Sequence, residues 1–162
     1  MTNLGFRLAM NEAGISVVDT AVGDRYVLEA LTGGGFSLGG EQSGHVIFSD
    51  LANTGDGLLT GLILADLVVR SARPLSELAS AVMTQLPQVL INVEVGQRRP
   101  DVAERIAAEI VEAARPLGDR GRILIRPSGT EPVVRIMVEA PTAELAHATA
   151  DSLIEPVRAA CC

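Results

Sequence analysis

A segment with the chemistry of a phosphate-binding loop lies toward the C-terminal end of the sequence. Residues 126–130 read Arg-Pro-Ser-Gly-Thr, and apolar stretches flank them on both sides. Arginine offers a planar fork of donors that matches a phosphate, serine and threonine add hydroxyl donors, and glycine lets backbone N–H groups approach an anion closely. Proline and glycine also favour a plain hairpin turn, so chemistry alone leaves both interpretations open.

A second candidate segment combines a carboxylate, a hydroxyl and several glycines. Residues 39–45 read Gly-Gly-Glu-Gln-Ser-Gly-His. Glu41 and Ser43 are two residues apart, so their side chains lie on the same side of an extended backbone. Such a pair accepts hydrogen bonds from, and donates them to, neighbouring hydroxyl groups of a sugar. The alternative is a capping turn with a solvated glutamate.

Further polar residues accompany these two segments. Asp24 and Arg25 follow Gly23 where a helix is expected to begin, a place typical of a capping aspartate and a surface arginine. His45 opens an apolar stretch, and a single histidine there is more often structural than catalytic. Asp56 is interpreted as the support of a helix start and not as a ligand-binding group.

The elements expected in the first half alternate between short helices and short strands. Helices are predicted at residues 3–12, 24–31 and 53–70, and strands at 15–18 and 45–48. This alternation indicates an α/β layer, which is expected to be a mixed sheet with helices.

A small α+β domain is expected in the last part, as an antiparallel sheet covered by two helices. Its predicted elements are a helix from Pro74, a strand at 87–95, a helix at 101–115, strands at 122–126 and 131–139, and a final helix from Thr142 that Pro156 ends or kinks. In the strand at 131–139 the alternation places Val134, Ile136 and Val138 on one face and Arg135, Met137 and Glu139 on the other.

The composition excludes several classes of function. The 162 residues are 48% hydrophobic and carry a net charge of −7, which is typical of a globular protein whose surface repels nucleic acid and anionic lipid. Three phenylalanines, one tyrosine and no tryptophan leave few rings to stack on bases. Since no leader or membrane-spanning stretch is visible, a cytoplasmic location is expected. Cys161 and Cys162 are expected to form an exposed, reduced tail.

Four motifs, in order, resemble those of the α-D-phosphohexomutases. Residues 126–132, followed by an apolar strand that contains an arginine, resemble the phosphate-binding loop of that family, and residues 39–45 resemble its sugar-recognition loop. Residues 20–27 resemble the loop near the sugar and its phosphate, and residues 54–57 resemble the start of the long helix that follows. The resemblance covers essentially the whole chain. Gln42 favours the bacterial branch that acts on glucosamine phosphates.

The resemblance implies a role for each candidate residue. The implied substrate-binding residues are Asp24, Arg25, Glu41, Ser43 and His45. The implied phosphate-binding residues are Arg126, Ser128, Gly129, Thr130 and Arg135. The first set would contact the sugar, and the second would hold the phosphate that does not react.

The implied reaction is an isomerisation by intramolecular phosphoryl transfer. It interconverts glucosamine 6-phosphate and glucosamine 1-phosphate through a phosphoserine and a glucosamine 1,6-bisphosphate, with Mg²⁺ as cofactor. Its product feeds UDP-N-acetylglucosamine and peptidoglycan precursors. Two alternatives stay open: the phosphomannomutase or phosphoglucomutase branch of the family, and a sugar-phosphate-binding module without chemistry.

Two motifs of that reaction have no counterpart in this sequence, namely the Ser-His-Asn-Pro donor loop and the Asp-Gly-Asp metal loop. We therefore expect a truncated chain: residues 1–72 as the later part of a third domain, 73–96 as a linking helix and strand, and 97–162 as a fourth domain. The preferred boundary lies at 96–100, with any position from residue 72 to 96 as the alternative. We expect no catalytic or metal-binding residue and no activity in this chain alone, and self-association or a homodimer through the truncated domain.

Overall fold

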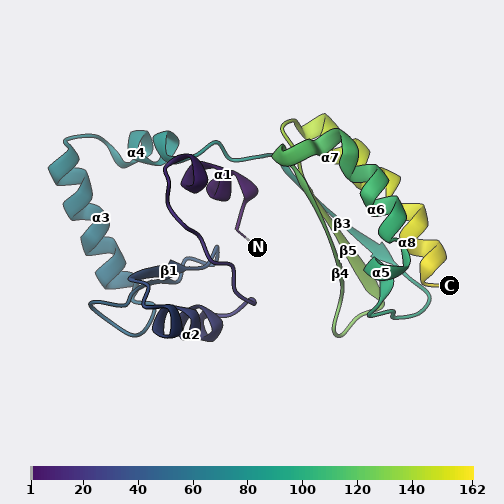
Figure 1. Cartoon of the computed structure of the whole chain (residues 1–162), viewed down its shortest axis with the longest axis horizontal. Coiled ribbons are helices and arrows are strands. Elements are labelled where there is room, and N and C mark those ends of the chain that lie inside the picture. Colours follow the sequence, from purple (N-terminus) through teal and green to yellow (C-terminus); the bar gives the residue numbers. More distant parts are fainter. Residues whose placement is uncertain (1) are drawn as a thin grey trace. The chain divides into compact units, whose positions relative to one another are not determined.

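The computed structural model describes residues 2–162, and the chain divides into two compact units (Figure 1). The first unit ends at Thr84 and the second begins at Gln85. The chain passes once from one to the other, between a helix and a strand. As the sequence predicts, an α/β part is followed by an α+β part.

The described part of the first unit contains helices and a small two-stranded antiparallel sheet. The elements are α1 (Leu4–Glu12), α2 (Asp24–Gly34), β1 (Leu38–Gly40), β2 (Val46–Phe48), α3 (Gly57–Ser71) and α4 (Leu75–Val82). A Cβ atom at Gly39 would come within 2.6 Å of Cγ1 of Val27, so glycine lets α2 pack closely on β1. The core of this unit consists of Val27, Leu31 and Ile47.

Two helices of the first unit begin at residues whose side chains cap them. Asn3 accepts a hydrogen bond from the N–H of Gly5 at 3.0 Å, ahead of α1. Asp56 accepts from the N–H groups of Leu58 and Leu59 at 2.9 and 3.0 Å, ahead of α3. Each cap satisfies N–H groups that have no partner inside the helix. The predicted role of Asp56 at a helix start is confirmed.

The strand predicted at residues 15–18 is not formed. These residues are irregular backbone after α1, and the side chains of Ile15 and Val18 are 54% and 57% exposed. Among residues 2–162, no strand pairs with them, and an extended segment gains little without a neighbour to share a ladder of hydrogen bonds. The helix predicted to end at residue 31 continues to Gly34, because the left-handed cap falls on Gly35, with φ of 65°.

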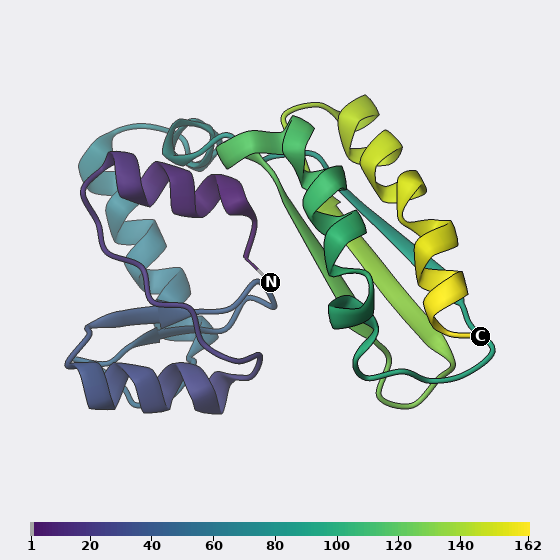
Figure 2. The same ribbon diagram turned by 45° about the vertical axis from the view of Figure 1, so that its right-hand side comes forward.

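The second unit is a three-stranded antiparallel sheet with helices on one face (Figure 2). Its elements are β3 (Gln88–Glu94), α5 (Val102–Arg105), α6 (Ala107–Ala114), the 3-10 helix η1 (Arg115–Arg120), β4 (Arg122–Pro127), β5 (Val133–Glu139), α7 (Ala143–Ser152) and α8 (Ile154–Ala160). The strand order is β3-β5-β4, so β5 is central and pairs with both neighbours.

The predicted alternation of β5 is confirmed on the helix-covered face but not on the other. The helix-covered face holds Val134, Ile136 and Val138, each at most 1% exposed. On the opposite face Arg135 is exposed, but Met137 and Glu139 are buried at 2% and 0%. Glu139 accepts a hydrogen bond from Nε of Arg122 at 2.6 Å, so the buried carboxylate is paired across the strands.

The helices of the second unit are more broken than predicted. The helix expected at 101–115 divides at Ile106, whose side chain is buried in the core with 3% exposure. The last helix divides at Leu153, and Pro156 lies in the first turn of α8, where a missing N–H costs nothing. No helix among residues 2–162 is long and apolar enough to cross a membrane.

The cysteine tail is only half exposed. Cys162 is exposed as predicted, but Cys161 is fully buried, which corrects the expectation of an exposed pair. Cys161 belongs to the core of the second unit, and its carbonyl accepts a hydrogen bond from the N–H of Gln97 at 3.1 Å. Burial raises the pKa of the Cys161 thiol.

Candidate functional site

The turn between β1 and β2 presents three of the predicted substrate-binding residues together. The N–H of Gly44 donates to the carbonyl of Glu41 at 3.1 Å, and the N–H of Glu41 donates to the carbonyl of His45 at 2.9 Å. Gly44 has φ of 95°, a conformation that favours glycine. Oγ of Ser43 lies 3.4 Å from Nδ1 of His45. The turn therefore holds Glu41, Ser43 and His45 within one hydrogen-bonded unit.

The Glu41 carboxylate joins this turn to the start of α2. Its Oε1 atom accepts a hydrogen bond from the N–H of Gly23 at 2.9 Å. A negative charge is favourable at a helix N-terminus, so the contact stabilises both segments. It also brings Asp24 and Arg25 beside the turn. Oε2 of Glu41 makes no hydrogen bond with a described residue, which leaves an acceptor for a ligand hydroxyl.

The ring of His45 is held by its neighbours. A Cβ atom at Gly55 would lie 2.8 Å from Cδ2 of His45, so the ring packs directly against this glycine in the segment before α3. Contact with Ser43 on one side and Gly55 on the other sets the orientation of the imidazole.

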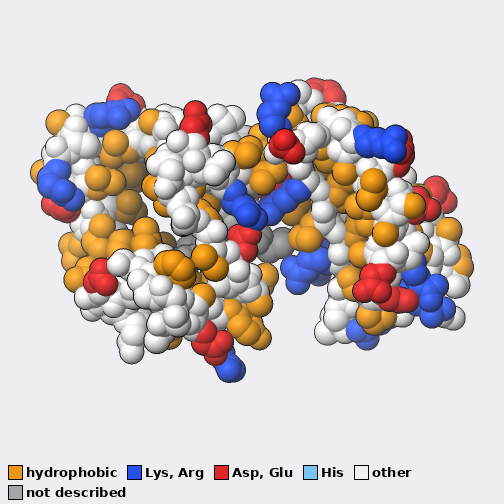
Figure 3. Space-filling model, viewed as in Figure 1, with side chains coloured by type: hydrophobic (Ala, Val, Ile, Leu, Met, Phe, Trp, Pro, Cys, Tyr) orange, Lys and Arg blue, Asp and Glu red, His pale blue; other side chains and the backbone are white. Residues whose placement is uncertain are grey.

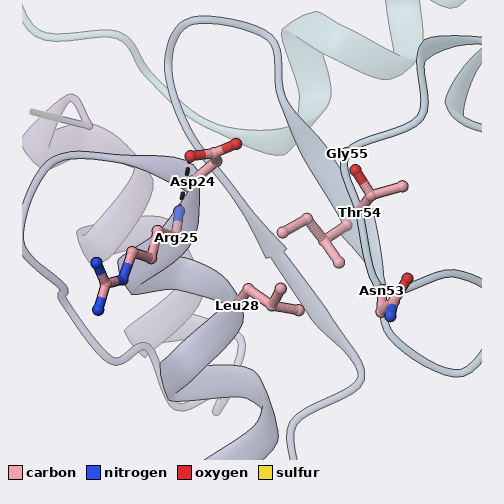
Figure 4. Close-up of a pocket in the computed structure, with 7 residues that line it drawn as sticks. Asp24, Arg25, Leu28, Asn53, Thr54 and Gly55 are labelled. Atoms are coloured by element: carbon pink, nitrogen blue, oxygen red, sulfur yellow. Dashed lines mark hydrogen bonds between the residues drawn. The ribbon is translucent and has the colours of Figure 1, made fainter.

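A cavity of about 230 Å³ lies between α2 and the segment that precedes α3 (Figure 4). Asp24 lies at its edge and accepts from the N–H of Arg25 at 2.7 Å. The side chain of Arg25 extends away from Leu28 and Asn53, and its Nε atom pairs with Glu29 at 2.8 Å. The hydrogen bond that Arg25 donates to Glu29, together with the negative charge of Glu29, raises the pKa of Arg25. A ligand would therefore have to bind the Nη donors of Arg25 or compete with Glu29 for Nε.

The hairpin between β4 and β5 holds the predicted phosphate-binding residues. The N–H of Ser128 donates to the carbonyl of Val133 at 2.8 Å, which closes the loop. Oγ of Ser128 lies 3.4 and 3.2 Å from the N–H groups of Thr130 and Glu131, which both donate to it. Two backbone donors thus converge on the Ser128 hydroxyl, and an anion that displaced this oxygen would meet the same donors. The hydroxyl keeps its own proton for donation.

A row of polar side chains crosses the sheet beside this loop. Arg126 in β4 lies directly opposite Arg135 in β5, and Arg135 lies directly opposite Asn92 in β3. Directly opposed residues point to the same face, and here it is the face that the helices leave uncovered. Among residues 2–162, no acidic side chain pairs with Arg135. A bound anion would interact favourably with both guanidinium groups.

Two residues beside the loop were not predicted from the sequence. Asn92 has a weak signal, because it is a polar residue in an apolar strand on the same face as Arg135. Arg98 has no signal in the sequence, because its guanidinium donates to the carbonyl of Gly129, which lies 31 residues further along the chain. Only the pairing of β3 with β5 brings these segments together.

Among residues 2–162, no three His, Cys, Asp or Glu side chains gather where they would bind one metal ion. The Mg²⁺ that the resemblance implies therefore finds no suitable set of carboxylates in this part of the chain.

Comparison with known proteins gives matches over both units. The family model described as phosphoglucomutase/phosphomannomutase, alpha/beta/alpha domain III, matches residues 1–86. The model described as phosphoglucomutase/phosphomannomutase, C-terminal domain, matches residues 90–155.

Similar proteins carry related names. The phosphoglucosamine mutase of Thermobifida fusca is 59% identical over 159 residues, which cover 98% of this chain and 35% of the relative. A crystal structure of Aspergillus fumigatus N-acetylphosphoglucosamine mutase with GlcNAc-6P and magnesium is 28% identical, with a TM-score of 0.55 over 68% of this chain and 22% of that one. A second structure of that enzyme, with glucose 1,6-bisphosphate, is 24% identical and shares the fold, with a TM-score of 0.76 over 99% of this chain and 37% of that one. The chain thus spans about a third of the length of the curated relative.

Proposed function

The chain belongs to the phosphoglucomutase/phosphomannomutase family, and on that premise we propose that it supplies the sugar-binding and phosphate-binding residues of a phosphoglucosamine mutase. The first unit contributes Glu41 and Ser43 as contacts to the hexosamine hydroxyls. The second unit contributes the loop between β4 and β5, with Arg126 and Arg135, as the site of the phosphate that does not react.

One observation carries the proposal: Arg126 and Arg135 lie opposite one another beside a loop whose backbone donors converge. A plain hairpin does not need the opposed arginines, since Pro, Ser and Gly alone supply the turn. Paired guanidinium groups and backbone N–H donors both bind phosphate oxygens strongly. Gly129 supports the same interpretation, because a Cβ atom there would meet no described atom within 4 Å and the loop surface stays open.

The sugar-binding role rests on the turn at residues 41–45. Glu41 has one carboxylate oxygen engaged by Gly23 and a second available as an acceptor. Ser43 and His45 stand beside it in the same turn and add a donor and a further polar group. An acceptor and a donor held at fixed separation suit adjacent hydroxyls of a hexose. Asp24, Arg25 and His45 complete the set of substrate contacts that we propose.

The proposed reaction belongs to the longer relatives, of which this chain spans 35%. A phosphoserine outside this chain gives its phosphoryl group to glucosamine 6-phosphate or glucosamine 1-phosphate, and glucosamine 1,6-bisphosphate forms. That intermediate reorients, and its other phosphate returns to the serine. Mg²⁺, when bound by residues of the rest of the protein, would neutralise charge on the transferring group. The residues of this chain hold the sugar and its distal phosphate during each transfer step and release them for the reorientation in between.

We propose that the chain alone is inactive, because it lacks the phosphoserine and metal loops of the resemblance. A sample with verified intact mass, incubated with glucosamine 6-phosphate and Mg²⁺, should form no glucosamine 1-phosphate. Turnover by that sample would contradict the proposal.

The glucosamine branch is proposed over the glucose and mannose branches because the relative from T. fusca bears that name and Gln42 lies in the sugar turn. The product would then feed UDP-N-acetylglucosamine and peptidoglycan precursors in the cytoplasm. A rate comparison of the full-length protein on glucosamine, glucose and mannose phosphates tests the branch. Preference for either other sugar would reassign it.

Phosphate binding is tested most directly by amide NMR. Titration of the chain with glucosamine 6-phosphate should shift the signals of Ser128, Gly129 and Thr130, and Arg135→Gln should weaken binding about tenfold through loss of a charge-assisted contact. Arg115→Gln is the matched control, since Arg115 is exposed and pairs with Glu112 at 3.1 Å away from the loop. If the amide signals of this loop in the wild-type chain do not shift at millimolar ligand, the proposed phosphate-binding function is overturned.

The apolar surface of α3 supports a further part of the proposal, self-association of the chain on its own. No residue of this 15-residue helix is buried. Apolar side chains gather over it in Figure 3, and those at least 40% exposed are Leu58, Leu62, Leu64, Leu67 and Val69. Helices in proteins are stabilised mainly by a packed apolar face, so this one favours a covering surface. A second copy of the chain offers the same surface.

A further inference from the structure

The polar segment that connects β3 to α5 reaches the loop between β4 and β5. Figures 1 and 2 both show this connection at the same end of the sheet as the hairpin. The contact begins at the strand ends, where the N–H of Val95 donates to the carbonyl of Pro132 at 3.0 Å. It ends at Arg98, whose Nη2 atom donates to the carbonyl oxygen of Gly129.

This hydrogen bond sets the direction of one peptide group in the loop. Because the peptide between Gly129 and Thr130 is planar and trans, its carbonyl and its N–H point in opposite directions. Arg98 holds the carbonyl, so the N–H of Thr130 is turned the other way, toward the point where Ser128 collects backbone donors. Without Arg98, only the 3.4 Å hydrogen bond from the N–H of Thr130 to Oγ of Ser128 holds this peptide within the described chain, and rotation would present its negative carbonyl end instead.

The positive charge of Arg98 also favours an anion at the loop. Arg98 is the third arginine at the loop, beside Arg126 and Arg135, in a chain whose net charge is −7. Three cations at one loop of an acidic protein create a local positive field that attracts an anion. The side chain of Arg98 is exposed, so its position at the loop is not a consequence of core packing.

We infer that Arg98 is a positioning residue of the phosphate site: it fixes the Gly129–Thr130 peptide with its donor toward the anion. The inference rests on the proposed function, since it concerns the phosphate that the loop is proposed to hold. It assigns a binding role to the segment 96–100, which the sequence marks only as a polar linker.

The test uses the full 162-residue chain, inorganic phosphate as the probe, and the amide signals of Ser128, Thr130 and Glu131. Arg98→Gln should shift the Thr130 signal before phosphate is added and raise the Kd for phosphate about tenfold. Arg98→Lys, which keeps a charged donor, should recover most of that affinity. Arg115→Gln removes the same charge from an exposed, unrelated position and should leave both the Kd and the Thr130 signal unchanged.

Added salt distinguishes the effect of the Arg98 hydrogen bond on phosphate binding from the effect of the Arg98 charge. At about 0.5 M NaCl, where exposed charges are screened over a few ångströms, the difference between Arg98→Gln and the wild type should persist if the hydrogen bond matters. The inference fails if the Gln variant keeps its β5 signals and binds phosphate within about twofold of the wild type. It also fails if the difference disappears in salt. A wild-type chain that binds no phosphate would instead overturn the proposed function.

Discussion

Replacement of Gly129 by alanine separates a phosphate loop from a plain hairpin turn. Gly129 is not among the glycines with positive φ, and a Cβ atom there would meet no described atom within 4 Å. The folded chain therefore accepts alanine at this position without strain. If glycine is required here, the requirement comes from a ligand that approaches the backbone closely.

The expected effects on stability and on binding have opposite signs. At a site compatible with alanine, Gly→Ala stabilises a protein by about 0.4–1 kcal/mol, mainly because the unfolded chain becomes less flexible. For a unit the size of residues 85–162, this corresponds to a rise in Tm of about 2–8 °C. In the phosphate complex, the new methyl group displaces the anion from a backbone donor. Loss of one such charge-assisted hydrogen bond weakens binding about tenfold or more.

Thermal unfolding followed by circular dichroism, with and without phosphate at constant ionic strength, measures both effects. At a phosphate concentration one hundred times the wild-type Kd, binding stabilises the wild type by about 2.7 kcal/mol. A tenfold weaker variant gains about 1.4 kcal/mol at the same concentration. Gly129→Ala should therefore unfold at a higher temperature than the wild type without phosphate and should gain about half as much from its addition.

Gly61 provides the matched control. It lies within α3, in the first unit, and a Cβ atom there also meets no described atom within 4 Å. Gly61→Ala should stabilise the helix without any change in the response to phosphate. If Gly129→Ala responds to phosphate as fully as the wild type does, the loop is an ordinary hairpin and the reasoning from its open surface is refuted.

Three further predictions follow from the two units. Arg122→Ala leaves the fully buried Glu139 carboxylate without this partner and should lower the free energy of unfolding, in urea denaturation, by about 3 kcal/mol, while a loss below about 1 kcal/mol would contradict the pairing. Iodoacetamide at mildly alkaline pH should modify Cys162 well before Cys161, as read by peptide mass spectrometry. Equal labelling rates of the two thiols in the folded chain would argue against the burial of Cys161. Because burial raises the folded pKa of Cys161, the stability that this shift contributes is present below the unfolded pKa and is lost as the pH rises through the folded pKa. Leu62→Lys should shift the chain toward monomer in sedimentation velocity if α3 mediates self-association, and an unchanged distribution would remove α3 from that role.

Local features of the fold were predictable because they depend on residues a few positions apart. Asp56 caps α3 through the N–H groups of Leu58 and Leu59, two and three residues further along the chain. The β4–β5 hairpin forms around its own proline and glycine. The strand expected at residues 15–18 failed for the opposite reason. Its apolar residues match a strand, but a strand exists only where a partner is present, and none of the described residues pairs with it.

Burial was the least predictable property. Cys161 ends in the core of the second unit, and Glu139 is buried on a face that alternation marks as polar. Both outcomes depend on which elements pack against these residues, and the periodicity of a single strand or helix does not contain that information. A buried carboxylate is tolerated because register places Arg122 directly opposite.

The sequence by itself determined the types of chemistry and their local setting: a loop with Arg, Ser, Gly and Thr, and a turn with Glu41 and Ser43. Only the tertiary structure decided which distant residues join them. Antiparallel register puts Arg126 opposite Arg135, and the β3-β5-β4 strand order brings Arg98 to the carbonyl of Gly129. Turn chemistry acts between neighbours in the chain, whereas an anion site needs charges that only the pairing of separate strands brings together.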